Sequence, residues 1–510
     1  MRLFRVFAVL VAASIAVAAQ QPPPPAPPQA PQKKAERKIT PAEAKELFAQ
    51  VDEILQFVSK DTGLPIKHSV KRKLTTRTEL RKYISERNRD DEETKRLQRA
   101  SIVLKKLGLI PREFDLDKFL GDLLEEQVAG YYDSKTKTVY LLDWIEPEGQ
   151  KPVLAHELTH ALQDQNFDLE KSMKKALKDE DQDALLKKRG ELEVGIEEPS
   201  TGRQAVVEGQ AMVVLVDYML APTGRTLLDS PLIGQMLKAQ TARMNDMPQL
   251  ASAPLYLRDA LIFPYTYGLD FVQEMMRQGG KQVAFSGVLN RAPRNTREVM
   301  DPAAYLANEK LEPLRLPDML GILGEVYEPY DVGNVGQFDV YTLLKQFAGE
   351  KTAERLAPEW RGGAYYAAGR RTGKAGNVDC AAKPAEPKAL EAQRVACLAM
   401  LTETRWKTPE AASQWAHRYA SLLLVKYRFA QSLNDEGEKA KATGSEEKAR
   451  ERCFTCPGGE RWMTDEGMVT IEQQGNVVLV LETFDDAVTA KLQKAAGALA
   501  SPQSTVHSPQ

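Results

Sequence analysis

The residues best suited to chemistry in this 510-residue chain are His156, Glu157 and His160, within the run His-Glu-Leu-Thr-His. In an α-helix, side chains four positions apart project from the same face, so the two imidazoles can bind one metal ion. A carboxylate beside that metal can accept a proton from a water molecule that the metal activates. The chain has only five histidines. Two of them at this spacing around a glutamate predict a metal site with its own general base.

The helix that carries this run is expected to be buried. The residues on either side, Val153-Leu154-Ala155 and Ala161-Leu162, are apolar, and two buried histidines on one face need a shared partner. The alternative is a helix whose imidazoles are solvated or bond backbone carbonyls. Asp164 lies one turn beyond His160 and is expected either to support the site through hydrogen bonds or to lie at a solvated helix end.

A catalytic zinc ion usually has three protein ligands and one open position. Our candidate for the third ligand is Glu208, within the apolar run Arg203–Val216, which predicts a buried helix. A lone buried carboxylate needs a cation, and the alternative to a metal is an arginine or the backbone. Gly209 and Ala211 have so little side chain that this helix can approach the histidine helix closely. Four nearby carboxylates are expected to face solvent: Glu191, Glu193, Glu197 and Glu198.

Two strand-like runs precede the histidine helix. Val128–Asp133 and Thr138–Leu142 flank the polar stretch 134–137, a pattern that predicts a β-hairpin. The edge of such a hairpin either pairs with an extended substrate backbone or packs into the core.

The composition and the N-terminus indicate an exported protein. The net charge of −2 gives no reason to expect nucleic acid or an anionic membrane as a partner. Arg2 and Arg5, the apolar run Val6–Val17 and the small residues 16–19 have the order of a secretory signal peptide. A retained membrane anchor is the alternative, although the apolar run is short for a span. We therefore expect a periplasmic or extracellular location.

The four cysteines, Cys380, Cys397, Cys453 and Cys456, all lie in the C-terminal third. In an exported chain they most simply form two disulfides, with three connectivities open. We favour Cys380 with Cys397 and Cys453 with Cys456. A redox pair or a four-cysteine zinc site is the alternative.

The sequence suggests five regions. They are a signal peptide (1–19), a proline-rich linker (20–39), a helical N-terminal region (40–120), a catalytic domain (121–345) and a smaller α+β domain with disulfides (346–510).

The run His156–Ala161, followed by Glu208-Gly209 on a later helix, resembles the gluzincin group of zinc metallopeptidases, and His156–Ala161 matches the thermolysin-like active-site helix. The chain is also similar to little-characterised secreted bacterial members that have a Gly-Tyr-Tyr-Asp hairpin before that helix. The resemblance covers about residues 121–345. The longer gap before Glu208 departs from the thermolysin pattern.

This resemblance implies an α+β fold: a mainly helical, zincin-like metallopeptidase domain with a small β-sheet. It also implies one Zn²⁺ held by His156, His160 and Glu208, with Glu157 as general base and a peptide or protein as substrate. Gluzincins commonly place a Tyr or His near the oxyanion. In Phe263–Gly268, Tyr267 is our first candidate for this donor and Tyr265 the second, with plain packing as the alternative.

Three hypotheses follow. The first is a secreted zinc endopeptidase acting on peptide bonds, which the intact Glu157 supports. The second is a zinc-stabilised binding or assembly module without turnover, and the third is a zinc hydrolase of a non-peptide amide. The remaining histidines, His68, His417 and His507, are expected to be structural or exposed.

Overall fold

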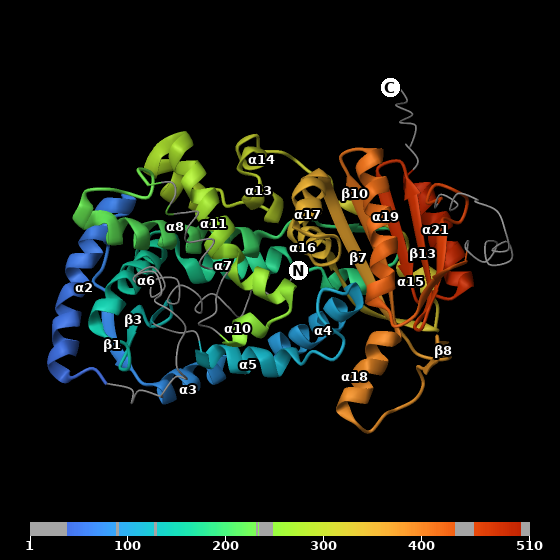
Figure 1. Ribbon diagram of the computed structural model, residues 1–510, viewed down its shortest axis with the longest axis horizontal. Coiled ribbons are helices and arrows are strands. Elements are labelled where there is room, and N and C mark those ends of the chain that lie inside the picture. The colour runs from blue at the N-terminus through green and yellow to red at the C-terminus, as the bar shows by residue number, and fades with distance from the viewer. Residues whose placement is uncertain are drawn as a thin grey trace, which may run out of the picture.

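The computed structural model describes residues 38–87, 91–126, 130–230, 233, 248–433 and 453–500. The predicted signal peptide and nearly all of the proline-rich linker lie outside these residues. The fold is α+β, as expected, with a mainly helical part that carries a small sheet and a second part built on a large sheet (Figure 1).

The helical part is built mainly on six helices. They are α2 (Pro41–Thr62), α4 (Asp91–Leu107), α5 (Leu116–Glu126), α6 (Pro147–Phe167), α8 (Pro199–Leu220) and α11 (Leu255–Lys281). Every residue of α6 from Pro152 to Asp164 is buried, which confirms the predicted burial of the histidine helix. The stretch Pro199–Thr223 is long and apolar enough to cross a membrane, but most of it is buried inside the protein. Because α8 packs against both α6 and α11, we interpret it as a core helix.

Gly209 in α8 allows a close helix approach, but its contact is with α11 rather than with the predicted histidine helix. A Cβ built on Gly209 would overlap the carbonyl oxygen of Gly268 in α11, and a Cβ on Gly268 would overlap that of Ala205. The two backbones therefore touch directly. Gly209 places α8 directly against α11, while the adjacent residue, Glu208, faces the histidines of α6.

The small sheet contains the predicted hairpin. Its strands are β1 (Lys71–Thr75), β2 (Gly130–Asp133) and β3 (Thr138–Leu142), in the order β1-β3-β2. β2 is antiparallel to β3, and β1 is parallel to it. Val128 and Ala129 lie outside the described residues. Within the described chain, β2 forms one edge of this sheet, with β1 at the other, and packs on α6.

The large sheet is antiparallel and has seven strands in the order β11-β12-β13-β14-β10-β7-β6. Their bounds are β6 (Tyr327–Asn334), β7 (Trp360–Arg370), β10 (Leu398–Trp406), β11 (Ala430–Ser432), β12 (Glu460–Thr464), β13 (Gly467–Gln474) and β14 (Val477–Glu482). Because β6 pairs with β7, the sheet begins inside the range 121–345 that the sequence assigned to the catalytic domain. Pro329 and Gly333 make β6 a poor strand by sequence alone.

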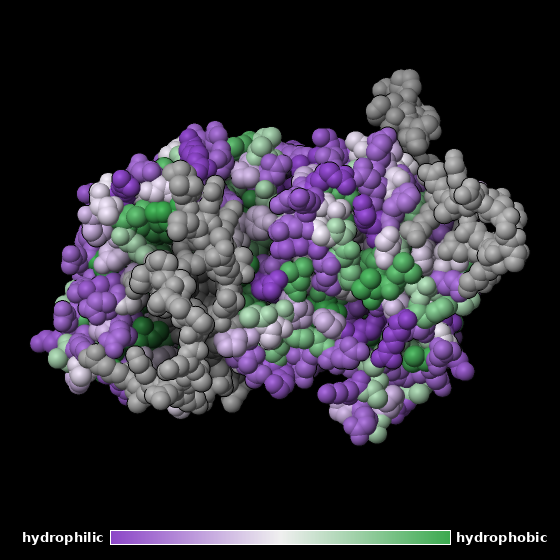
Figure 2. All heavy atoms as spheres, in the orientation of Figure 1, coloured by the Kyte–Doolittle hydropathy of each residue, from purple (hydrophilic) through white to green (hydrophobic). Residues whose placement is uncertain are grey.

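Helices cover both faces of the large sheet (Figure 1). On one face α16 (Gln337–Ala348) and α19 (Pro409–Lys426) share a continuous hydrophobic core with the helical part. On the other, α15 (Met319–Leu323) and α21 (Asp486–Ala500) form a second core with the short ribbon of β4 (Leu192–Val194) and β5 (Leu314–Leu316). The visible surface is largely hydrophilic (Figure 2).

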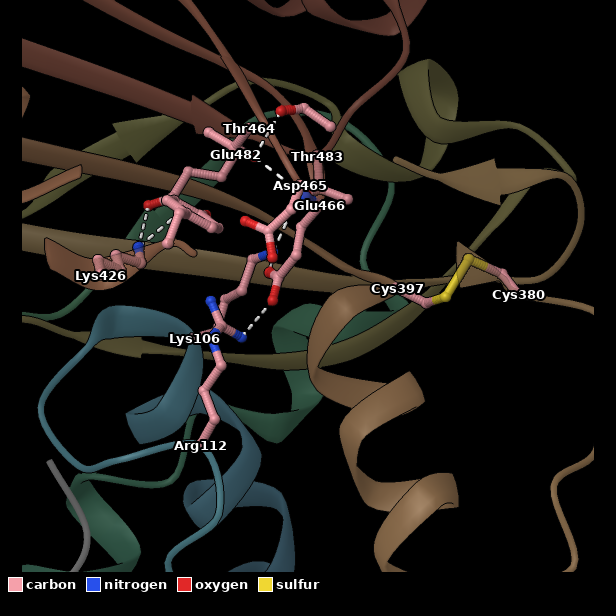
Figure 3. Close-up of polar contacts among 12 residues, drawn as sticks. Lys106, Arg112, Cys380, Cys397, Lys426, Thr464, Asp465, Glu466, Glu482 and Thr483 are labelled. Atoms are coloured by element: carbon pink, nitrogen blue, oxygen red, sulfur yellow. Dashed lines mark hydrogen bonds and ion pairs between the residues drawn. A yellow bond between two sulfur atoms is a disulfide. The ribbon is translucent and has the colours of Figure 1, made fainter. Parts of the chain in front are cut away.

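A group of buried charges also links the helical part to the large sheet (Figure 3). We call Lys106, Arg112, Lys426, Glu466 and Glu482 the ion cluster. The Nζ atom of Lys106 lies 2.9 Å from Glu466, Arg112 lies 2.6 Å from the same carboxylate, and Lys426 lies 2.6 Å from Glu482. Because Lys106 belongs to α4, these contacts tie the N-terminal helices to the C-terminal sheet.

The cysteines pair as the sequence favoured. Cys380 is bonded to Cys397 (Figure 3), and Cys453 to Cys456. The described residues contain no free cysteine.

Candidate metal centre

The structure brings His156, His160 and Glu208 together between α6 and α8. The Nε2 atoms of the two histidines are 3.0 Å apart, and Glu208 Oε2 lies 3.2 Å from His156 Nε2 and 3.4 Å from His160 Nε2. All three side chains are buried. Helical spacing aims both imidazoles at α8, and the buried face of α8 supplies the carboxylate.

The geometry of these three atoms fits a zinc ion. Ligand atoms about 2.0–2.2 Å from a tetrahedral zinc ion lie about 3.3 Å from one another, close to the three separations observed. Glu208 Oε2 is buried without a hydrogen bond of good geometry. A buried carboxylate oxygen in this state is costly unless a cation binds it. These three residues can therefore hold a metal ion.

The charges of the three groups lead to the same conclusion. Burial lowers the pKa of His156 to about 4. Burial also opposes the charged forms of His160 and Glu208, but their mutual attraction prevails. It raises the pKa of His160 to about 9 and lowers that of Glu208 to about 2. Without a metal, the site thus keeps one proton on an imidazole as the counter-charge of Glu208, a role that a metal ion can take over.

Glu157 belongs to the same helix but is held by the hairpin. The backbone N–H of Tyr132 in β2 donates a hydrogen bond of 2.8 Å to Glu157 Oε2. Gly130 allows this approach, since a Cβ there would press against Val153 at 3.2 Å. Burial raises the pKa of Glu157 to about 7. A carboxylate with such a pKa can both accept and release a proton near neutral pH.

Two glutamines that the sequence analysis missed support the site. Gln163 Oε1 lies 2.9 Å from His160 Nδ1, and its amide donates to Gln210 Oε1 at 2.7 Å and to the carbonyl of Val207 at 3.0 Å. Gln210 in turn donates to the carbonyl of Ala284 at 2.7 Å. An acceptor on Nδ1 fixes the ring orientation and makes Nε2 the metal-binding atom. The sequence signal was the position of Gln163, one turn after His160.

Asp164 has the supporting role, but not through an imidazole. It accepts hydrogen bonds from the hydroxyl of Tyr132 at 2.8 Å and from Lys137 at 2.6 Å, and its side chain is buried. Both donors come from the hairpin. Asp164 therefore fastens the hairpin to α6, and with it the strand that holds Glu157.

The two candidate tyrosines point in different directions. Both lie inside α11, and residues two apart on a helix do not share a face. The ring of Tyr265 is stacked on that of His156, with centroids 6.5 Å apart. Tyr267 instead packs on Phe263 and Tyr341, at 5.1 and 6.4 Å between centroids. The structure thus brings Tyr265 to the metal site, rather than our first candidate Tyr267.

The predicted exposure of the remaining glutamates is correct for three of the four. Glu191, Glu193 and Glu197 are exposed as expected, but Glu198 is buried. It accepts hydrogen bonds from the backbone and hydroxyl of Thr296 at 3.0 and 2.7 Å, so that expectation was wrong. His68 is exposed, His417 bonds the carbonyl of Ser413 at 2.8 Å, and His507 lies outside the described residues.

Comparison of the chain with protein-family models, with curated proteins and with solved structures gave no match. A functional assignment therefore depends on the residues of the site.

Proposed function

We propose that this protein is an exported zinc-dependent metallopeptidase, with His156, His160 and Glu208 as zinc ligands and Glu157 as general base. The observation that carries the proposal is the close approach of the three ligand atoms, at 3.0, 3.2 and 3.4 Å, inside a buried site. A site that only stabilised the fold would more commonly have four protein ligands. The described residues supply three.

A bound zinc ion would supply a Lewis acid that polarises the scissile carbonyl and makes water acidic. Glu157 would accept the proton of that water and pass it to the departing amine. Burial raises its pKa to about 7 in the metal-free site, and the charge of a bound ion would lower that pKa, which favours the carboxylate form that accepts the proton. The N–H of Tyr132 keeps the carboxylate oriented, and Gln163 keeps His160 oriented. Tyr265, stacked on His156, is the better candidate than Tyr267 for the donor that stabilises the developing oxyanion.

The hairpin supports a peptide as the substrate. Tyr132 aims its N–H at Glu157 and therefore away from β3, so its side of β2 faces the metal site. An extended peptide can add to such an edge through backbone hydrogen bonds. The two disulfides agree with an oxidising compartment, and hence with export to the periplasm or the outside of the cell.

The test is hydrolysis of a quenched-fluorescence mixed-peptide library by wild type and by Glu157→Gln, with zinc quantified in both. We expect one zinc per chain in both proteins and cleavage by wild type alone. Glu191→Gln is the matched control, because Glu191 is exposed.

Zinc in both proteins without cleavage by either would favour the alternative of a zinc-stabilised binding module. Release of amines from non-peptide amides alone would favour the other alternative, a non-peptide amidase. The absence of zinc from wild type would remove the proposal.

A further inference from the structure

The second core contains a cavity that the proposed reaction does not use. Its volume is about 530 Å³, within the range of about 300–1,000 Å³ of small-molecule sites. The floor is the outer face of the large sheet, and the walls come from the β4–β5 ribbon and from α21. The metal centre lies in the helical part, between α6 and α8, so this cavity is a separate site.

Strand register arranges the floor in two rows. Leu479 of β14 lies between Glu403 of β10 and Glu472 of β13, because it is the direct partner of both. In the next row, Val477 lies between Arg405 and Gln474. Each row thus has an apolar centre with a polar residue at either end. Such a floor suits a ligand that has an apolar body and charged ends.

The buried carboxyl group of Glu403 is the main indication that this cavity binds a ligand. It is only 8% exposed, yet it lines the cavity, and its side chain has no hydrogen bond or ion pair with any residue that the structure describes. Glu472, by contrast, already accepts hydrogen bonds from Gln474 and Gln493, each at 2.7 Å. Burial raises the pKa of Glu403 to about 7, against the opposing effect of the charge on Arg405. An ammonium group entering the cavity would provide a direct ion-pair partner.

Two arginines provide the opposite charge. Arg405 lies two residues after Glu403 on the same strand, so both point to the same face about 6.5 Å apart along the strand. Arg405 is held by the carbonyls of Glu312 and Pro313, at 3.2 and 3.5 Å, and this leaves further N–H donors of its guanidinium for a ligand. Arg315 of β5 also lines the cavity. The site thus offers a buried anion, a neighbouring cation and apolar surface between the strands.

We propose that this cavity binds a dipeptide, with the α-ammonium group against Glu403, the carboxylate against Arg405 and the side chains over Leu479 and Val477. A dipeptide carries both charges a few ångströms apart on a compact body, and the cavity volume accommodates it. The inference goes beyond the proposed function and does not depend on it, because binding here involves none of the metal ligands.

The test is calorimetric titration of the metal-depleted protein with Leu-Leu, after chelation, so that neither hydrolysis nor binding at the metal centre contributes. We expect saturable binding to one site per chain. N-acetyl-Leu-Leu lacks the ammonium group and Leu-leucinamide lacks the carboxylate, so each should bind about tenfold or more weakly. Glu403→Gln should weaken Leu-Leu by a similar factor without changing the affinity for N-acetyl-Leu-Leu.

Glu354→Gln, at an exposed glutamate of α17 (Glu350–Leu356), is the matched control and should bind Leu-Leu like wild type. If Glu403→Gln fails to fold, Ala496→Phe provides a second variant, because it fills the wall formed by α21. No binding of Leu-Leu at millimolar concentration would overturn the proposal. Equal binding of the acetylated and free dipeptides would also do so, as would unchanged affinity in Glu403→Gln.

Discussion

The ion cluster and the metal centre are both groups of buried charges between distant parts of the chain. They differ in the source of the positive charge that balances each buried carboxylate. In the ion cluster, Glu466 and Glu482 each face an amine or guanidinium of the protein, at 2.6–2.9 Å. In the metal centre, the charge partners of Glu208 among the described residues are two imidazoles. One region therefore has its cations covalently built in, whereas the other has to obtain a proton or a metal ion from solution.

The difference indicates what each region does. A carboxylate with a built-in cation is satisfied in every condition near neutral pH, so it suits a structural link between domains. A carboxylate that depends on an exogenous cation is costly without it but can leave a coordination position open when the metal is bound. Glu403 is a third case, since among the described residues its side chain has neither an ion-pair partner nor a metal-ligand partner, and Arg405 acts on it only as a neighbouring charge. The predictions below alter each case in turn.

The largest effect is expected from Glu208→Ala, which removes the charge that the metal has to balance. We expect loss of stoichiometric zinc and a fall in peptide hydrolysis of at least about 10³-fold, because the Lewis acid is lost with the ligand. Metal analysis and the peptide-library assay measure both quantities. Glu191→Ala should change neither. Full zinc retention in Glu208→Ala would show that Glu208 is not a ligand.

A substitution in the ion cluster should lower the free energy of unfolding without changing the zinc content. Lys426→Met leaves Glu482 buried among hydroxyl groups of Tyr419 and Tyr427, and breaking a buried ion pair costs about 3–5 kcal/mol. We expect that loss in urea unfolding, with zinc stoichiometry unchanged. Lys407→Met, at an exposed lysine, is the control. A loss below about 1 kcal/mol would mean that the cluster contributes little to the link between the two parts.

The two regions also differ in how far the sequence predicted them. The two histidines were predictable because helical spacing is local, and Glu208 because a lone acid in an apolar helix needs a cation. The ion cluster was not, because Lys106 and Glu466 are 360 residues apart in the sequence and neither lies in a distinctive local pattern. Glu198 was assigned to solvent from its polar neighbours, whereas Thr296, remote in sequence, buries and binds it.

The choice between the tyrosines illustrates the same limit. Phe263–Gly268 stood out in the sequence only as a short aromatic run, but α11 begins at Leu255 and carries both tyrosines and Pro264 inside it. Once Tyr265 and Tyr267 are on one helix, their directions differ, and the packing of α11 on α8 selects which of them faces His156. A local pattern cannot supply that packing.

Glu403→Gln tests the carboxylate that has no ion-pair partner among the described residues. A carboxyl group whose pKa rises from 4.5 in the unfolded chain to about 7 in the folded protein binds protons more tightly when folded. Its contribution is therefore fully favourable below pH 4.5 and is lost as the pH rises through 7. We expect wild type to lose up to about 3 kcal/mol relative to Glu403→Gln between pH 4.5 and pH 8. Parallel stability profiles of the two proteins, measured by denaturant unfolding, would contradict this expectation.

The smallest effect should come from Gly209→Ala, which alters the position of a ligand without changing any charge. The added Cβ meets the backbone of Gly268, which cannot turn aside as a side chain would, so α8 has to shift away from α11. Overpacking of this kind costs about 1–3 kcal/mol. Because Glu208 is the adjacent residue, the shift should also weaken zinc binding. Gly121→Ala in α5 is the matched control, since its Cβ meets open space and alanine favours a helix by up to about 1 kcal/mol. If Gly209→Ala keeps wild-type zinc affinity while losing stability, the contact between α8 and α11 supports the fold but does not set the position of Glu208 in the metal centre.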